Sequence, residues 1–348
     1  MTAGAKNMIV GNKTGLTVAA GLARGLTEFA AAHGASRDEM LNRAGIKPAD
    51  LADQDNRIPF EKYVVLMRTG KELTGDPALA LHYGAANDMA EVSVVGLIAN
   101  ASETMFEAFQ QLSRYGRLVI EFDGGPDRFS VAQEDGGLWA VDNRQNANEF
   151  PELTESTFAR MVCGPRRFGV TQLAKRICVT HPPPPYADEY ERIFQAPVTF
   201  GAKWNAMMVD ERWMFHRLNQ QPRYVFGVLS ERADALLKDL ENSKTMRGTV
   251  EALLMPVLHK GEANIDAVAD KLGMSRQTLF RRLKEEDVTF EIVLDELRHR
   301  LALDYLRARK VSVNETAYLV GFSDPAAFSR AFKRWTGTTP SSVRNDKT

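Results

Sequence analysis

The sequence predicts two domains: an α+β domain, in which helices flank a mostly antiparallel sheet, and an all-α domain that follows it. The chain has 348 residues, which is more than one hydrophobic core usually organises. The N-terminal part mixes helical apolar periodicity with short β-branched or aromatic runs, whereas the C-terminal part shows helical periodicity alone. From Lys244 to Thr348 there are 18 Lys and Arg against 14 Asp and Glu, and the preceding part has 26 against 31. A basic module of net charge +4 therefore follows an acidic module of net charge −5.

The N-terminal part begins with helices, after a flexible N-terminus expected over residues 1–15. Ser36 is a suitable N-cap for the second helix because its hydroxyl can accept a hydrogen bond from a free backbone N–H. Apolar residues at helical spacing predict helices over Leu16–Ala32, Arg37–Ala44, Pro59–Leu73, Asp76–Tyr83, Val92–Ala99 and Thr104–Arg114.

A sheet is predicted in the middle of the chain, where the first three strands form a meander with turns at 123–127 and 134–137. The strands are expected over Leu118–Phe122, Arg128–Gln133, Leu138–Asn143, Lys175–Thr180, Val198–Phe200 and Trp204–Val209, with helices over Glu152–Cys163 and Tyr186–Phe194. The run His181-Pro-Pro-Pro-Pro185 suits neither a helix nor a central strand. It is either a stiff spacer or a polyproline ligand for another protein.

The domain boundary follows an amphipathic helix predicted over Tyr224–Asn242. The polar stretch 241–245 interrupts the apolar pattern and predicts a short linker over residues 241–247. The domains are therefore expected over residues 16–240 and 248–348.

Composition and motifs exclude several classes of protein. Apolar residues at 44% and charged residues at 26% are typical of a soluble globular protein. The chain has no run of 18 apolar residues and no signal segment, which predicts a cytoplasmic protein without a membrane span. Cys163 and Cys178 are too few for a disulfide framework or a thiolate zinc site. The six histidines show no metal-ligand spacing, and nucleotide-binding and hydrolase motifs are missing, so neither a metal nor a cofactor is expected.

The C-terminal part contains an internal repeat, over residues 269–284 and 317–333. Both copies read Ala-x-x-(Leu or Val)-Gly-(Met or Phe)-Ser, followed by (Leu or Phe)-x-Arg-x-(Leu or Phe)-Lys. A small residue where helices cross, Gly in a tight turn and apolar residues that anchor a second helix are the features of a helix-turn-helix unit. A long helix between the copies would hold them at a fixed separation. Two recognition helices on one chain could then enter successive segments of the DNA major groove.

Residues 262–344 closely resemble the DNA-binding domain of the AraC/XylS family of bacterial transcription regulators. The resemblance rests on Arg298-x-x-x-Ala302 in the connecting helix and on the second copy, Gly321-Phe-Ser-Asp-Pro-Ala-Ala-Phe-Ser-Arg-Ala-Phe-Lys-Arg-Trp-Thr-Gly-Thr-Thr-Pro340. Two residues depart from the pattern: Asp287 stands where the family usually carries Gly, and Val343 stands where Tyr is common.

The N-terminal 240 residues resemble the arabinose-binding-type sensor domain of the same family, a name that does not establish arabinose as the ligand. This resemblance is carried by Leu16–Phe29, by Gly96–Leu112 and by the run Tyr190-x-x-x-Phe194-x-x-Pro197-Val198-x-Phe200.

The resemblance implies a sequence-specific transcription regulator, not an enzyme, that senses a small molecule and binds DNA with two recognition helices. The implied partners are double-stranded promoter DNA, an unknown small-molecule effector, a second copy of the chain and, for an activator, RNA polymerase. One alternative is a constitutive DNA binder whose N-terminal domain only dimerises. Another is an enzyme, such as an alkyl-transfer repair protein, fused to a DNA-binding module; it would need a reactive or zinc-bound cysteine cluster.

Helical geometry identifies the residues that would face DNA, because Leu279 and Leu283 in the first recognition helix, and Phe328 and Phe332 in the second, must face the core. The candidate contacts on the opposite faces are Ser275, Arg276, Gln277, Phe280, Arg281, Lys284, Pro325, Ala326, Ser329, Arg330 and Lys333. Arg and Gln can make bidentate contacts to guanine and adenine, whereas Ala offers only a methyl group. The first unit is therefore expected to read more bases, and the second mainly to position the protein. A salt bridge within the domain is the alternative role for Arg281.

The N-terminal domain offers few clear ligand groups. The residues that could line an apolar pocket are Phe106, Trp139, Tyr186, Trp204, Met207 and Trp213. The residues that could meet a carboxylate or phosphate are Arg114, Arg117, Arg166 and Arg167. Ordinary core packing and a solvated surface are the respective alternatives.

Overall fold

The computed structural model describes residues 15–123, 127–218 and 222–345 and divides into two compact units, Met1–Leu237 and Lys238–Thr348. Residues 1–14 of the predicted flexible N-terminus, and 124–126 of the predicted turn, lie outside the described residues. Helix α10 (Arg223–Asn242) runs across the boundary between the units. Only residues 243–245 separate it from the next helix, which Thr245 caps by accepting a hydrogen bond from the Gly248 N–H at 2.9 Å.

The first unit begins with a short strand, not with the helix predicted over Leu16–Ala32. Strand β1 (Thr17–Ala19) pairs antiparallel with β2 (Arg57–Pro59), because this β-branched start finds a partner that is distant in the sequence. Helix formation then begins at Ala20. The helices described in this unit before α10 are α1 (Ala20–Ala32), α2 (Arg37–Ala44), α3 (Phe60–Thr74), α4 (Leu79–Ala86), α5 (Met89–Val92), α6 (Val94–Ala101), α7 (Met105–Val119), α8 (Glu152–Cys163) and α9 (Ala187–Phe194).

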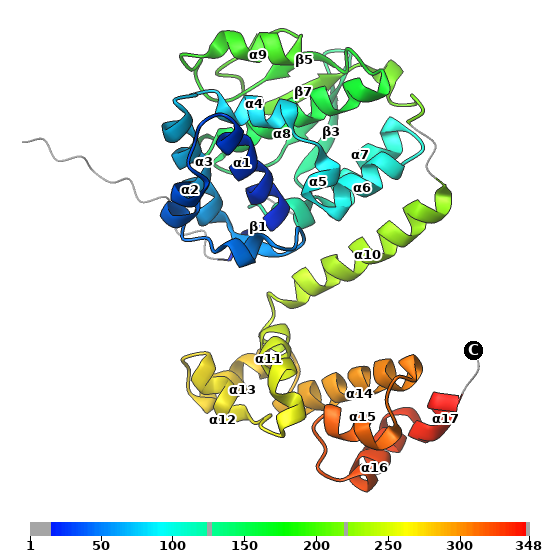
Figure 1. The fold of residues 1–348 in the computed structure, drawn as a ribbon. Coiled ribbons are helices and arrows are strands. Elements are labelled where there is room, and N and C mark those ends of the chain that lie inside the picture. The colour runs from blue at the N-terminus through cyan, green and yellow to red at the C-terminus, as the bar shows by residue number, and fades with distance from the viewer. Residues whose placement is uncertain (1–14, 124–126, 219–221, 346–348) are drawn as a thin grey trace, which may run out of the picture. The chain divides into compact units, whose positions relative to one another are not determined.

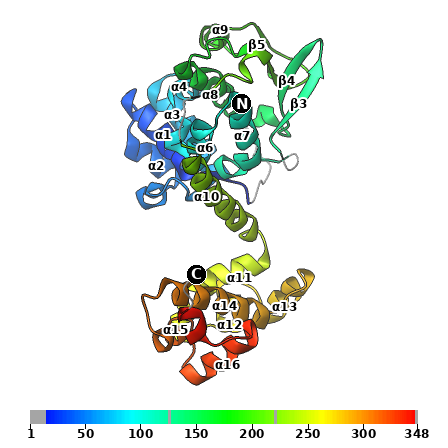
Figure 2. The ribbon, with the colours of Figure 1, turned by 90° about the vertical axis from the view of Figure 1, so that its right-hand side faces the viewer.

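A five-stranded sheet lies in the same unit, in the order β3-β4-β7-β5-β6. All neighbouring strands are antiparallel except β5 and β6, which confirms the predicted mostly antiparallel arrangement. The strands are β3 (Phe129–Glu134), β4 (Gly137–Asp142), β5 (Ala174–Cys178), β6 (Val198–Thr199) and β7 (Asn205–Val209). Helices α1–α3 gather on one side of the unit, and the β3–β4 hairpin lies on the other (Figure 2).

The predicted strand over Leu118–Phe122 is wrong. Helix α7 continues to Val119, and the buried residues Tyr115, Leu118 and Val119 keep its helical period facing the core. Only an isolated bridge between Ile120 and Val18 is β-like in this segment. Strands β3 and β4 therefore form a hairpin, and the third place is taken by β7.

Helix α8 is the central helix of the first unit, since it contacts α4, α9 and the short 3-10 helix η3 (Gly164–Phe168). Phe158 from α8, Ile177 from β5, Tyr190 from α9 and Met207 from β7 belong to one buried cluster. The proline run connects β5 to α9 and begins at buried His181, whose Nε2 lies 3.0 Å from the Tyr190 hydroxyl.

The second unit is entirely helical among its described residues (Figure 1). Helix α14 follows the pair α12–α13 in the chain and precedes the pair α15–α16, and it contacts α11, α15 and α17. The elements are α11 (Met246–Leu254), the 3-10 helix η5 (Met255–Lys260), α12 (Ile265–Lys271), α13 (Arg276–Glu285), α14 (Phe290–Ala308), α15 (Val313–Leu319), α16 (Pro325–Thr336) and α17 (Pro340–Asn345). One continuous core unites them and includes fully buried Leu279, Val293, Leu297, Phe328 and Phe332. No helix within the described ranges is both long and apolar enough to cross a membrane.

Candidate nucleic-acid interface and apolar cavity

The first repeat copy folds as α12, a tight turn and α13. Gly273 sits in the turn with a φ of +63°, a left-handed conformation that favours glycine. Ser275 is the N-cap of α13, and its hydroxyl accepts a hydrogen bond from the Thr278 N–H at 3.1 Å. Leu279 and Leu283 are buried, so the opposite face of α13 is left to solvent.

The second copy folds as α15, a turn and α16, but its turn is enclosed by other parts of the unit. Gly321 has a φ of +81°, and a Cβ on it would lie 2.4 Å from the Leu258 carbonyl oxygen. Arg298 of α14 donates hydrogen bonds to the carbonyls of Val320, at 3.2 Å, and Gly321, at 3.1 Å. Burial lowers the pKa of the Arg298 guanidinium. The Arg298-x-x-x-Ala302 pattern thus fixes the second turn to the connecting helix.

The N-cap of α16 is Asp324, whose carboxylate accepts hydrogen bonds from the N–H groups of Ala326 and Ala327, both at 3.0 Å. These bonds lower the pKa of the Asp324 carboxyl. Gly337 is the C-cap of α16 with a φ of +75°. At the corresponding end of α13, Asp287 has a φ of +56°, so the departure from the family's Gly places a side chain where the backbone is left-handed.

The exposed face of α13 is basic and weakly paired within the unit. Arg276 lies 3.6 Å from Asp266, and Arg281 lies 3.8 Å from Glu285, in pairs whose four side chains are all at least 65% exposed. Exposed pairs at such distances contribute little to stability, so both guanidinium groups can exchange their partners for DNA. Gln277 and Lys284 are exposed on the same helix, and Phe280 is 51% exposed.

The outer face of α16 is smaller and less polar. Arg330 lies 3.9 Å from Asp324, again in an exposed pair, and Lys333 and Ala326 are exposed. Pro325 and Ser329 are half-buried. The structure therefore brings the candidate residues of each copy to one helix face, with fewer hydrogen-bonding groups on α16.

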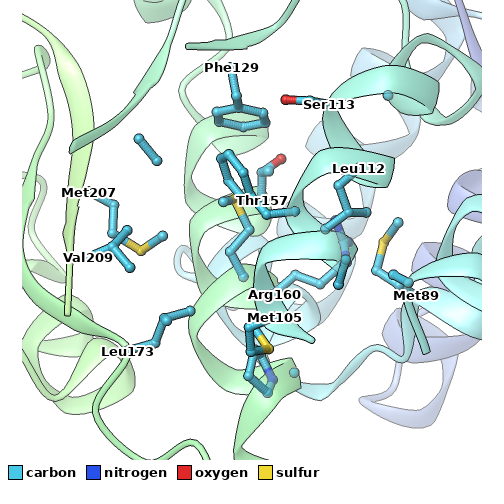
Figure 3. Close-up of a pocket in the computed structure, with 18 of the residues that line it drawn as sticks. Met89, Met105, Leu112, Ser113, Phe129, Thr157, Arg160, Leu173, Met207 and Val209 are labelled. Atoms are coloured by element: carbon cyan, nitrogen blue, oxygen red, sulfur yellow. The ribbon is translucent and has the colours of Figure 1, made fainter. Parts of the chain in front are cut away.

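A cavity of about 180 Å³ opens in the first unit. Figure 3 shows Met207 and Val209 of β7 on one side, Leu112 and Ser113 of α7 on the other, and Thr157 of α8 between them. Helix α7 keeps Phe109 and Leu112 only half-buried because they border this space. The lining is mainly aliphatic, aromatic and methionine side chains.

Three arginines line the cavity, and they differ in how they are neutralised. Arg128 donates two hydrogen bonds to Asp142, at 3.4 and 3.1 Å, and Arg167 forms an ion pair with Asp88. Arg160 is only 7% exposed, yet its Nε and Nη2 have no hydrogen-bond partner within the described part of the chain.

The similarity to known proteins covers both units. The family model described as "Arabinose-binding domain of AraC transcription regulator, N-term" matches residues 34–218, which is more than half of the chain. The chain belongs to the AraC family of transcription regulators. A second model, described as a helix-turn-helix domain, matches residues 268–346 of this AraC-family regulator. Both resemblances stated from the sequence are thereby confirmed.

Full-length relatives of this AraC-family regulator are themselves regulators. The "Ornithine utilization regulator" of Pseudomonas aeruginosa is 26% identical over 339 residues, covering 96% of this chain and 98% of the relative. The "HTH-type transcriptional regulator VirS" of Mycobacterium tuberculosis is 22% identical and covers 92% of this chain and 94% of its own. The solved structure of the transcriptional regulator CdpR from Pseudomonas aeruginosa has a TM-score of 0.40 at 22% identity, covering 89% of this chain and 96% of that one.

The cavity includes some of the predicted ligand groups of the AraC-family regulator and omits others. Trp139, Met207 and Arg167 line it. The other candidates, Phe106, Tyr186, Trp204, Trp213, Arg114, Arg117 and Arg166, are not among the lining residues. Sequence reasoning missed Arg160, because an arginine in the predicted helix over Glu152–Cys163 carries no sign that its guanidinium is buried.

Proposed function

We propose that this AraC-family regulator binds promoter DNA sequence-specifically through α13 and α16, under the control of a small molecule bound by its N-terminal domain. The observation that carries the proposal is the pair of exposed, weakly paired basic helix faces, which belong to one helical unit and are connected through α14. Two such helices suit successive major-groove segments of one operator.

The two helices divide the work of recognition. Gln277, Arg276 and Arg281 on α13 can form bidentate hydrogen bonds with base edges, and Phe280 can contact a thymine methyl group. Arg330 and Lys333 on α16 meet phosphates, which set register but carry no sequence information. Ser275 acts mainly as the cap that starts α13, since its hydroxyl already accepts a backbone hydrogen bond.

The cavity favours effector control over constitutive DNA binding, because a domain that only dimerises has no need of an open apolar space lined by a buried cation. Effector binding would shift the population of conformations with different DNA affinity. A net charge of +4 on the DNA-binding module is modest, so a homodimer supplies tight operator occupancy. RNA polymerase is a further partner if the protein activates its promoters.

The enzyme alternative gains no support from the cysteines. Burial raises the pKa of the Cys163 thiol and that of the Cys178 thiol, whereas a reactive cysteine needs a lowered pKa. No group of three His, Cys, Asp or Glu side chains suited to a metal ion is found among the described residues.

Genome-wide mapping of bound sites tests the DNA-binding proposal. We expect the full-length protein to occupy discrete sites with two half-sites about 10 base pairs apart. A variant with Arg276→Ala and Arg281→Ala should lose these sites while keeping its thermal unfolding midpoint, because both side chains are exposed. Occupancy without sequence enrichment, or unchanged occupancy by this variant, would contradict the proposal.

A further inference from the structure

We propose that the cavity of the N-terminal unit binds an amphipathic monocarboxylate, with its carboxylate held by Arg160 and its apolar body enclosed between α7, α8 and the sheet. The inference rests on the proposed function, because it names the chemical class of the effector. It adds a binding residue that the sequence did not reveal.

Arg160 is buried, but its guanidinium lacks hydrogen-bond partners for two of its nitrogens. Its side chain is 93% buried, since only 7% remains exposed, and Nε and Nη2 have no hydrogen-bond partner in the described ranges. Its guanidinium lies 5.4 Å from the centre of the Tyr83 ring. Burial raises the pKa of Tyr83 to about 12, although the charge of Arg160 and its hydrogen bond with that hydroxyl oppose the rise, so Tyr83 stays neutral and supplies no countercharge.

A buried cation without a countercharge is costly in a folded protein, and binding an anion removes this cost. No ion pair within 4.0 Å involves Arg160 among the described residues, in contrast to Arg128 and Arg167, which also line the cavity. Arg167 pairs with Asp88, and Arg128 shares Asp142 with Arg144, so each of the other two cavity arginines has a carboxylate partner. Arg160 is the cavity arginine without a carboxylate partner in the described ranges, and one carboxylate on a ligand would supply that partner.

The shape of the Arg160 guanidinium favours a carboxylate as its ligand. A guanidinium presents parallel N–H donors that match the two oxygens of a carboxylate. Arg160 lies among the lining side chains near Thr157, Leu112 and Met105 (Figure 3). Nε and Nη2 are adjacent nitrogens of one edge, so the unpartnered atoms are those that a bidentate carboxylate would engage.

The apolar lining and the size of the cavity restrict the rest of the ligand. Most lining side chains, such as Met105, Phe109 and Met207, offer no strong hydrogen-bonding groups. The neutral polar side chains on the lining are Asn100, Ser113 and Thr157, too few for the many hydroxyls of a sugar. The cavity volume of about 180 Å³ is slightly larger than the roughly 150 Å³ that suffices for benzene. A small aromatic ring or short alkyl chain with one carboxylate therefore matches both size and chemistry.

The test begins with paired probes on the full-length protein: phenylacetate against phenylacetamide, and hexanoate against hexanamide. Calorimetric titration and thermal unfolding report binding without any need for DNA. We expect each carboxylate to bind at least about tenfold more tightly than its amide and to raise the unfolding midpoint. Equal binding of acid and amide, or no binding by either carboxylate, would overturn the inference.

Arg160→Met removes the charge while keeping an apolar side chain of similar length. We expect it to weaken carboxylate binding by roughly 10- to 100-fold and to abolish the preference for acid over amide. Arg167→Met is the matched control, because Arg167 also lines the cavity but is paired with Asp88; its carboxylate affinity should stay within about threefold. A larger loss of carboxylate affinity in Arg167→Met than in Arg160→Met would show that Arg167, and not Arg160, holds the carboxylate.

Unfolding of the ligand-free variants separates a binding role from a structural one. An uncompensated buried charge is costly to the folded state, and Arg160→Met removes it, so the free variant should unfold no earlier than the wild type. A clearly lowered midpoint would mean that Arg160 serves the fold. If the protein binds its promoter sites but none of the carboxylates, this inference fails and the proposed function stands. If the protein binds carboxylates but not promoter DNA, the proposed function fails and the assignment of the cavity to a carboxylate stands.

Discussion

The two helix-turn-helix units have the same order of helices and turn, but they differ in how enclosed the turn is and in which side chains the second helix exposes. In the first, the turn at Gly273 is open, with no heavy atom within 4 Å of the Cβ position, and α13 presents Gln277 and two weakly paired arginines. In the second, Leu258 and Arg298 enclose the turn at Gly321, and α16 presents Ala326 and half-buried Pro325. The unit with the more enclosed turn is thus the one whose second helix exposes fewer hydrogen-bonding groups.

Two copies of one motif can therefore expose different helix faces. The enclosed second turn orients α16 through contacts with η5 and α14, which suits a helix that sets the register of the protein on phosphates. The open first turn leaves α13 with more polar side chains, which suits a helix that reads bases. Four pairs of substitutions test the comparison.

The largest effect is expected from the two turn glycines. Gly321→Ala should lower the free energy of unfolding by about 3 kcal/mol, because left-handed strain adds to a clash with the Leu258 carbonyl oxygen. Gly273→Ala is the matched change and should cost about 1 kcal/mol, since only the strain remains. Chemical denaturation measures both. Equal losses would mean that the two turns are equally enclosed.

The next effect concerns base reading by α13. Gln277→Ala should reduce affinity for the preferred operator by about 1–3 kcal/mol and relax specificity at one base pair. Ser329→Ala on α16 is the control and should leave sequence preference unchanged, because that side chain is half-buried and short. Binding to a library randomised over one half-site resolves the difference. An even loss across all sequences for Gln277→Ala would remove the distinction between the helices.

A smaller and more uniform effect is expected from Lys333 on α16. Lys333→Ala should weaken binding about threefold on every sequence and lower the slope of log affinity against log salt by about 1, because one phosphate contact is lost. Lys238→Ala removes the same charge from an exposed position on α10 and should leave the slope unchanged. A change of base preference in Lys333→Ala would assign base reading to the second unit as well.

The smallest effect distinguishes the ends of the two recognition helices. Asp287→Gly should raise the free energy of unfolding by about 0.5–1 kcal/mol, because glycine adopts a positive φ without strain. Gly337→Asp makes the reverse change at the end of α16 and should lower it by a similar amount. Thermal unfolding of both variants measures the pair. Stabilisation by both substitutions, or by neither, would show that backbone strain does not distinguish these positions.

Much of the DNA-binding unit could be predicted from the sequence because its signals are local. The glycines at Gly273 and Gly321, the caps at Ser275 and Asp324, and the helical spacing of Leu279, Leu283, Phe328 and Phe332 each follow from neighbours a few residues away. Local propensity failed where a distant partner decided the outcome. Thr17–Ala19 became a strand by pairing with Arg57–Pro59, and the β-branched end of α7 stayed helical because its buried face packs on the core.

The candidate effector site shows most clearly what residue type in the sequence could not predict. Trp139, Met207 and Arg167 were named from residue type, but type could not separate them from Trp204 or Arg166, which do not line the cavity. The sequence alone determined the family, the paired helix-turn-helix units and the exposed faces of α13 and α16, because helical periodicity and turn chemistry are properties of short segments. Only the tertiary structure decided that Arg160 is buried beside an apolar cavity while Arg128 and Arg167 have carboxylate partners. Burial and countercharge depend on which distant segments pack together, and no short segment of sequence records that.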